Sequence, residues 1–118
     1  MKTNIQTRKL ISALKKAGQQ VPLWKRIAVE LEKSTRAMTA VNLDKISKTT
    51  KEGEIALIPG KVLSVGNLTK KTTVAAFKFS EAAREKINKN GEAITIEQLL
   101  QKNPKGSKVR ILKWTQNL

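Results

Sequence analysis

The sequence predicts one domain of the α/β class, and three observations support this prediction. From residue 41 onward, short apolar runs typical of strands alternate with segments of helical periodicity. Of the 118 residues, 39% are apolar, which is enough for one packed core. No low-complexity linker and no repeat interrupts the chain. We therefore expect a single domain over residues 1–118, in which residues 1–36 form a basic helical segment and residues 37–118 form the α/β core.

The first helix is expected in NIQTRKLISALKKAG. Its apolar residues Ile5, Leu10, Ile11 and Leu14 fall largely on one side, its other side is basic, and Gly18 ends it.

The second helix is expected to begin at Pro22, because proline is favoured in a first helical turn. Trp24, Ile27, Ala28 and Leu31 then follow at the spacing of one helical face. Since Trp24 belongs to this apolar stripe, we interpret it as a core anchor rather than as a platform for stacked bases.

The middle of the chain is predicted to contain short strands. VNLDKI (residues 41–46) begins with strand-like alternation, although Ile46 fits a helical turn equally well, and TTKEGE is turn-like. IALI and KVLSV are expected to be two short strands separated by a turn or a bend at Pro59-Gly60. The β-branched residues of TTVAAFKF predict a further strand.

The next segments carry clear boundary signals. Ser80 is placed to cap a helix through EAAREKINKN, which Gly91 ends. A brief strand at AIT leads to Thr95, which stands three residues before Gln98, the spacing of a capping box. The helix that follows, IEQLLQKN, stops at Pro104.

The last predicted strand lies in KVRILKW. Val109 and Ile111 alternate there with Lys108 and Arg110. This alternation predicts a strand with one buried face and one basic face.

The charge of the chain indicates a polyanionic partner. Its 24 basic and 9 acidic residues give a formal net charge of +15, and such self-repulsion destabilises a compact monomer unless a polyanion neutralises it. Three zones contain basic residues and no acid, namely residues 1–29, 55–80 and 98–118. Their separation predicts a surface that meets phosphate groups from several sides.

The residues that are missing argue against an enzyme. The chain has no histidine, cysteine or tyrosine, so the commonest general base, the thiol nucleophile and the usual nitrogen and sulfur metal ligands are absent. Its acids mostly stand among lysines at helical spacing, as Glu81, Glu85 and Lys89 do, which is typical of a solvated helix face. We expect no catalytic site, no cofactor and no metal.

A membrane partner is also not expected. No window approaches the roughly 18 continuous apolar residues of a membrane helix. The start of the chain, MKTNIQTRKL, has no signal-peptide character, and we therefore expect an intracellular protein.

The stretch IPGKVLSVGNLTKKTTVAAFKF (residues 58–79) is similar at first sight to a phosphate-binding loop. Such a loop has two glycines separated by four residues and then a lysine. Here Gly60 and Gly66 are separated by five residues, and Asn67 stands where lysine is required. The motif fails, and what remains is a glycine-containing connection in which Lys61 and the Lys70-Lys71 pair are placed to meet a phosphate backbone.

The order of several segments resembles one protein family. LWKRIAVELEK, AVNLDKI, IPGKVLSVGNLTKKTTVAA, FSEAAREKI and ITIEQLLQKNPKGSKVRI together closely resemble the archaeal and eukaryotic large-subunit ribosomal proteins called L-eighteen-e, which are relatives of bacterial L-fifteen. The likeness covers about residue 8 to residue 112, and the compact length resembles the archaeal form.

The resemblance implies irregular strand-strand-helix turns with basic N-terminal helices. It also implies a structural role in translation, a cytoplasmic location in the large ribosomal subunit, and neither catalysis nor a small-molecule substrate. The implied partners are large-subunit rRNA and neighbouring ribosomal proteins, with the chain present as a monomer in the ribosome. Basic side chains would neutralise phosphates and release counterions while the backbone fits folded rRNA by shape. The alternative hypothesis is a free, chromatin-like nucleic-acid-binding protein.

The predicted RNA contacts come from the acid-free zones, from the basic residues at and after the end of the second helix, and from the RNA-facing elements that the resemblance implies. They are Arg8, Lys9, Lys15, Lys16, Lys25, Arg26, Lys33, Arg36, Lys45, Lys61, Asn67, Lys70, Lys71, Lys105, Lys108 and Arg110. Lys78, Lys86 and Lys89 are expected to be merely solvated.

Overall fold

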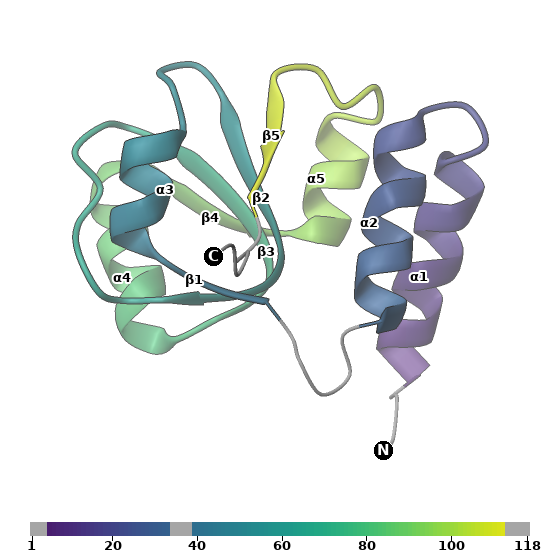
Figure 1. Cartoon of the computed structure of the whole chain (residues 1–118), viewed down its shortest axis with the longest axis horizontal. Helices are drawn as coiled ribbons and strands as arrows, with labels where there is room; N and C mark the ends of the chain where they lie inside the picture. Colours follow the sequence, from purple (N-terminus) through teal and green to yellow (C-terminus); the bar gives the residue numbers. More distant parts are fainter. Residues whose placement is uncertain (1–4, 34–38, 113–118) are drawn as a thin grey trace, which may run out of the picture.

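The computed structural model describes residues 5–33 and 39–112. It is of the α/β class, which confirms the predicted fold class (Figure 1). In chain order the elements are α1 (Ile5–Ala17), α2 (Pro22–Lys33), β1 (Thr39–Asn42), α3 (Leu43–Thr49), β2 (Ile55–Leu63), β3 (Thr73–Phe79), α4 (Glu81–Asn90), β4 (Glu92–Thr95), α5 (Ile96–Lys102) and β5 (Val109–Ile111).

The five strands form one sheet in which every pairing is parallel. Strand β3 pairs with β2 from Ile55 to Val62, and its other neighbour is β4. Since β3 takes one edge of β2 along most of its length, β5 and β1 share the other edge. There β5 pairs with residues 55–57 of β2, and β1 pairs with residues 60–63.

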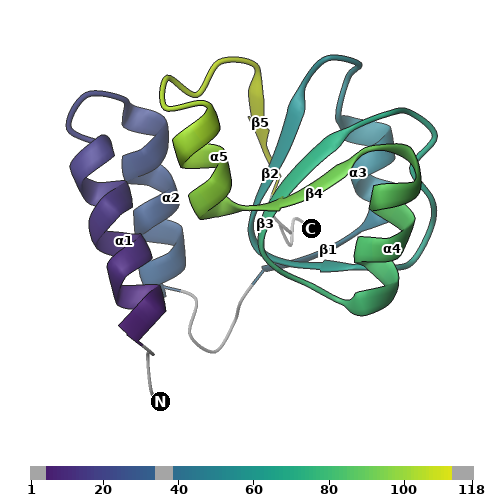
Figure 2. The same ribbon diagram turned by 180° about the vertical axis from the view of Figure 1, so that it is seen from behind.

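Helices cover both faces of this sheet. Helices α1, α2 and α5 lie on one side, and α3 and α4 lie on the other, as the two opposite views show (Figures 1 and 2). Neighbouring residues of one strand serve opposite layers: Leu57 packs with the α1, α2 and α5 residues, whereas Ala56 and Ile58 pack with those of α3 and α4. Strands buried on both faces are typical of parallel sheets, and they explain why IALI is a continuous apolar run.

The first two helices are confirmed, together with the predicted end of the first and the predicted start of the second. The backbone N–H of Gly18 donates to the Leu14 carbonyl at 2.8 Å where α1 ends. Trp24 of α2 is fully buried, and its indole Nε1 donates to the carbonyl oxygen of Pro104 at 2.7 Å. The indole therefore serves as a core anchor and also fastens the segment after α5 to α2.

The predicted capping signals are confirmed too. Ser80 Oγ accepts from the backbone N–H of Ala83 at 3.2 Å at the start of α4. Thr95 and Gln98 form both hydrogen bonds of the capping box at the start of α5.

One expectation in the middle of the chain needs correction. The predicted turn at Pro59-Gly60 is wrong, because both residues are buried inside the continuous strand β2. The β2–β3 register shifts between Ile58 and Lys61, so the Pro-Gly pair produces a bulge in the ladder. With paired strands on both edges, β2 continues as one strand through this irregularity.

The segment VNLDKI divides between a strand and a helix. Its first residues belong to β1, but Leu43 begins α3, in which Leu43 and Ile46 are fully buried. The two alternatives left open for this segment are thus both realised, one after the other. Helix α3 has only 7 residues, and the spacing of apolar residues over so short a segment does not distinguish a helix from a strand.

Candidate nucleic-acid interface

Most of the predicted RNA contacts are exposed. The side chain of Lys33 and the whole of Arg36 lie outside the described part of the structure. Lys70 and Arg110 are only half-exposed. The exposed predicted contacts are Arg8, Lys9, Lys15, Lys16, Lys25, Arg26, Lys45, Lys61, Asn67, Lys71, Lys105 and Lys108.

Tertiary packing brings the first and last acid-free zones together. The turn after α1 meets α2 closely, since a Cβ at Gly18 would lie 2.7 Å from Cβ of Lys25. The α5–β5 connection lies against the start of α2, where a Cβ at Gly106 would lie 2.5 Å from Leu23 Cδ2, in addition to the indole bond to Pro104. In both views the α1–α2 turn and the α5–β5 connection lie at the same end of the molecule (Figures 1 and 2).

We call this region the basic end. It carries the two lysines of the last turn of α1, the lysine of the first turns of α2, and the two lysines of the α5–β5 connection. These residues are Lys15, Lys16, Lys25, Lys105 and Lys108. The segments that form it come from the zones that contain no acid, although Lys15 reaches Glu32 of α2 in an exposed ion pair of 2.9 Å.

The α5–β5 connection has a defined backbone. Asn103 donates from its side-chain nitrogen to the Ser107 carbonyl at 2.9 Å, and its carbonyl accepts from the N–H of Gly106 at 3.0 Å. Gly106 has a φ of 68°, and Lys108 has a φ of 58°, which is uncommon for a residue with a side chain. This backbone presents Lys105 and Lys108 as exposed side chains.

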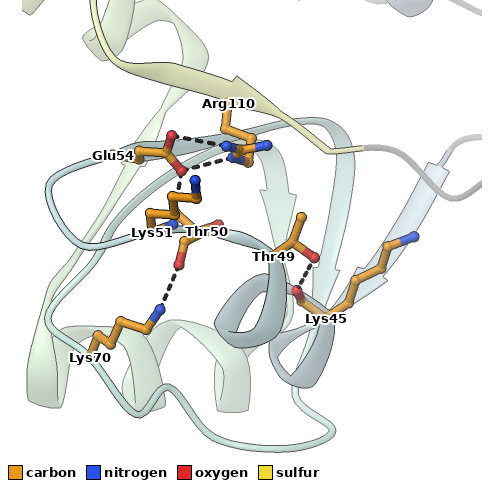
Figure 3. A network of polar contacts seen from close by, with 7 residues as sticks. All are labelled: Lys45, Thr49, Thr50, Lys51, Glu54, Lys70 and Arg110. Carbon is orange, nitrogen blue, oxygen red and sulfur yellow. Dashed lines mark hydrogen bonds and ion pairs between the residues drawn. The ribbon is translucent and has the colours of Figure 1, made fainter.

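Arg110 has an internal partner, which the sequence pattern did not reveal. Its Nε and Nη2 donate to the two carboxylate oxygens of Glu54 at 2.7 and 3.1 Å (Figure 3). The hydrogen bond from Arg110, followed by one from the backbone N–H of Lys51, lowers the pKa of Glu54 from 4.5 to about 2. The same bond to Glu54 raises the pKa of Arg110. The guanidinium therefore ties β5 to the segment before β2.

Lys70 is also engaged within the protein. Its ammonium donates to the carbonyl of Thr50 at 2.8 Å, at the end of α3. Figure 3 shows Lys45 nearby, where its carbonyl accepts from Thr49 Oγ1 at 2.7 Å while its own ammonium points away from this network. Of these two predicted contacts, Lys45 is thus the one whose ammonium is exposed at the surface.

The expectation that Lys86 is merely solvated is wrong. Its ammonium is half-buried and donates to the carbonyls of Ser64 and Gly66 at 2.9 and 3.0 Å. Lys78 and Lys89 are exposed, as expected.

The glycine requirement at residue 66 also has an internal cause. Gly66 has a φ of 93°, and a Cβ there would lie 2.6 Å from Cβ of Asp44. The absence of a side chain at Gly66 therefore permits a close contact with Asp44 of the same chain. Sequence reasoning could not find this contact, because Asp44 precedes Gly66 by more than twenty residues.

A second basic locus lies where β2 and β3 run beside each other. Lys61 and Lys78 are partners in the parallel register, and both are exposed. Neighbouring strands lie about 4.8 Å apart, so the backbones of these two basic residues are direct neighbours across the strands. Lys78 is 5.9 Å from the centroid of the Phe77 ring, and Arg84 of α4 is 5.6 Å from that of Phe79.

Within the described ranges no helix has the length and apolarity needed to cross a bilayer. The same part of the chain holds no group of three or more histidine, cysteine or acidic residues placed to hold a metal ion.

Comparison with known proteins gives a consistent result. The family of "Ribosomal protein 60S L18 and 50S L18e" matches residues 8–118. "Large ribosomal subunit protein eL18" of Methanosphaerula palustris is 50% identical over 115 residues, which are 95% of each chain. The proteins of the same name from Methanococcus maripaludis and Sulfurisphaera tokodaii are 47% and 45% identical, over 95% and 94% of this chain and 96% and 93% of their own length.

Proposed function

We propose, from the premise that the chain belongs to the family of ribosomal proteins 60S L18 and 50S L18e, that its basic end binds folded rRNA in the large ribosomal subunit. The protein is a structural constituent of that subunit in the cytoplasmic ribosome, and its role in translation follows from this membership. The other hypothesis, a free chromatin-like nucleic-acid-binding protein, finds no support in the comparisons.

One observation carries the proposal: the packing of α2 joins two acid-free zones that are far apart in sequence. Trp24 and Leu23 hold the α5–β5 connection against the helical hairpin. The resulting cluster of exposed lysines has the charge and spread that phosphate groups of several RNA segments require. The remaining exposed residues predicted to contact RNA extend this interface.

The mechanism that we propose is neutralisation without base reading. Lysine ammonium groups are point charges that bind phosphate oxygens and release counterions. The chain has two tryptophans and two phenylalanines, and Trp24 is buried, so stacking on splayed bases contributes little. The protein thereby stabilises the tertiary structure of rRNA and catalyses no reaction. Residues 1–118 act as one unit in this role, with the rRNA and neighbouring ribosomal proteins as partners.

Gradient sedimentation of a lysate after ultraviolet crosslinking tests the proposal. The protein should sediment with large subunits, and its crosslinks should map to a compact set of large-subunit rRNA sites. Scattered crosslinks, or protein that stays at the top of the gradient, would contradict the proposal.

A pair of double variants tests the role of the basic end. Lys25→Ala/Lys105→Ala removes two of its charges, and Lys48→Ala/Lys89→Ala removes two exposed charges from α3 and α4. The first variant should leave large subunits at lower KCl, because it loses the affinity of two phosphate contacts, and its slope of log K against log salt should be shallower by about 1.4–1.8. Equal release of both variants would place the interface elsewhere.

A further inference from the structure

The loop between β2 and β3 (residues 64–72) is an unusual connection. It joins two neighbouring parallel strands and contains neither helix nor strand. Parallel strands are usually joined by a crossover of a dozen or more residues that contains a helix. A connection without regular structure leaves its backbone N–H and C=O groups to find partners elsewhere in the protein.

One side of the β2–β3 loop is bonded to the region of α3. The N–H of Val65 donates to Asn42 Oδ1 at 3.3 Å, and its carbonyl accepts from the N–H of Asp44 at 3.0 Å. Further along, the N–H of Thr69 donates to Ser47 Oγ at 3.2 Å.

The other side is bonded to α4, chiefly through Lys86. The ammonium of Lys86 bridges the carbonyls of Ser64 and Gly66 at 2.9 and 3.0 Å, and Asn90 Nδ2 donates to the carbonyl of Leu68 at 3.4 Å. In the described part of the chain Lys86 has no carboxylate partner, and its charge is directed at backbone carbonyls alone. One cation thus turns two carbonyls of the loop inward.

The same loop presents other groups outward. Leu68 is 8% exposed and anchors the loop in the core, whereas Val65 is 65% exposed. Asn67 and Lys71, which are both predicted RNA contacts, are exposed as well. The loop lies in the zone from residue 55 to residue 80 that contains no acid.

We propose that Lys86 is a positioning residue for RNA binding, which holds the β2–β3 loop in the conformation that presents Asn67 and Lys71 to rRNA. This inference rests on the proposed function, since it names the residue that prepares one part of the rRNA-binding surface. Lys86 acts through the loop and does not itself contact phosphate, because its ammonium is already bonded to two carbonyls.

Loss of the ammonium has a specific consequence. Without it the Ser64 and Gly66 carbonyls lose their partner, and the loop must be ordered at the moment of binding. Ordering lowers affinity without removing a phosphate contact. The salt dependence of binding separates the two effects, because its slope counts the phosphates that are neutralised.

The experiment compares Lys86→Met, Lys89→Met and Lys71→Ala in binding to full-length large-subunit rRNA transcribed in vitro, over a series of KCl concentrations. Lys89 is the matched control, because it lies on the same helix, is exposed and loses the same charge. Lys86→Met should raise Kd about tenfold with an unchanged salt slope. Lys71→Ala should make the slope of log K against log salt shallower by about 0.7–0.9. Lys89→Met should leave Kd close to that of the original protein.

Hydrogen exchange of the free protein provides the second measurement. In Lys86→Met the amides of the β2–β3 loop should exchange faster while those of β2 and β3 keep their protection. If Lys86→Met fails to fold, Lys86→Gln, which retains an N–H donor, is measured instead and should raise Kd by less than about tenfold with an unchanged salt slope, whereas an unchanged Kd would contradict the positioning role.

The outcomes are distinct. If Lys86→Met binds as the original protein does, or if its salt slope falls, the positioning role is wrong, and in the second case Lys86 is a phosphate contact. If the original protein shows no preference for the rRNA over an unrelated RNA of equal length, the proposed function itself fails.

Discussion

Arg110, Lys70 and Lys86 are basic residues of similar reach whose roles are set by what lies within hydrogen-bond distance. Arg110 donates two hydrogen bonds to the carboxylate of Glu54, and Lys70 donates one to the carbonyl of Thr50. Lys86 donates to two carbonyls of the β2–β3 loop. By contrast, Lys105 has an exposed side chain in a loop held by backbone and amide bonds. At the scale of the residue, local hydrogen-bond partners therefore distinguish Arg110, Lys70 and Lys86 from an exposed lysine such as Lys105.

Trp24→Phe tests the link between α2 and the α5–β5 connection. The change removes the 2.7 Å bond to Pro104 and leaves a small void in a fully buried site. We expect the free energy of unfolding to fall by about 1–3 kcal/mol, as measured by urea denaturation. The neighbouring exposed Lys25→Ala should change it by less than about 0.5 kcal/mol. Equal effects of the two changes would contradict the anchoring role.

The Glu54–Arg110 pair makes stability depend on acid pH. The pKa of Glu54 is about 2 in the folded protein and 4.5 in its ordinary state. Because the folded value is the lower one, the pair stabilises the fold fully above about pH 4.5, and this contribution is lost as the pH falls toward 2. The melting temperature of Glu54→Gln should lie below that of the original protein at pH 7, and the two should converge in acid. If the two melting temperatures differed by the same amount at every pH, the charges of the ion pair would not stabilise the fold.

At the scale of the element, the unusual features of this sheet lie in strand β2 and in the loop that follows it. Strand β2 holds β3 on one edge and both β5 and β1 on the other, and the Pro59-Gly60 pair lies within it. The β2–β3 loop then returns the chain to the start of β3 with bonds to both α3 and α4. The row formed by Lys61 and Lys78 stands on the two strands that this loop joins.

Lys61→Glu should have opposite effects on stability and on RNA binding. It replaces a repulsive cross-strand pair with an attractive one, so the free protein should gain about 0.2–1 kcal/mol at low salt. Affinity for large-subunit rRNA should fall, because a phosphate contact becomes a repulsion. Thermal unfolding and a filter-binding titration measure the two effects.

Lys61→Gln is the control for this prediction. It removes the repulsion without adding an attraction, and should fall between the original protein and Lys61→Glu in both measurements. A loss of stability in Lys61→Glu would show that the two lysines do not repel each other in the fold.

At the scale of the whole molecule, a net charge of +15 is carried by a compact α/β body. The sheet is buried under helices on both faces, so most of the basic side chains in the described part of the chain lie on the exposed faces of the helices and on the connections between the elements. Such a body is stabilised by anything that binds its native surface and neutralises it.

A polyanion should therefore raise the melting temperature of the free protein. Inorganic polyphosphate at about 100 times its Kd should add about 2.7 kcal/mol to the free energy of unfolding. Screening at 1 M KCl, where the Debye length is about 3 Å, should remove most of the gain. Scanning fluorimetry with and without salt measures both effects. A melting temperature that polyphosphate does not change would contradict the role of surface repulsion.

The sequence by itself determined the features that depend on near neighbours. These were the α/β class, the two N-terminal helices, the caps at Ser80 and Thr95 and the three acid-free zones, because periodicity, capping and charge counts all act within a few residues. It also carried enough of a family pattern to identify the protein class. These local rules did not predict that a segment as short as α3 is a helix. They also did not predict that the Pro-Gly pair forms a bulge within a strand.

Only the tertiary structure decided which cations meet each other and which are occupied. The bonds that settle it join residues far apart in sequence: Trp24 with Pro104, Glu54 with Arg110, and Lys86 with Ser64 and Gly66. A hydrogen bond forms within about 3 Å, and no local pattern encodes that proximity. Hence the acid-free zones are visible in the sequence. The basic end and the hydrogen bonds of Lys86 to the β2–β3 loop exist only once the layers have packed.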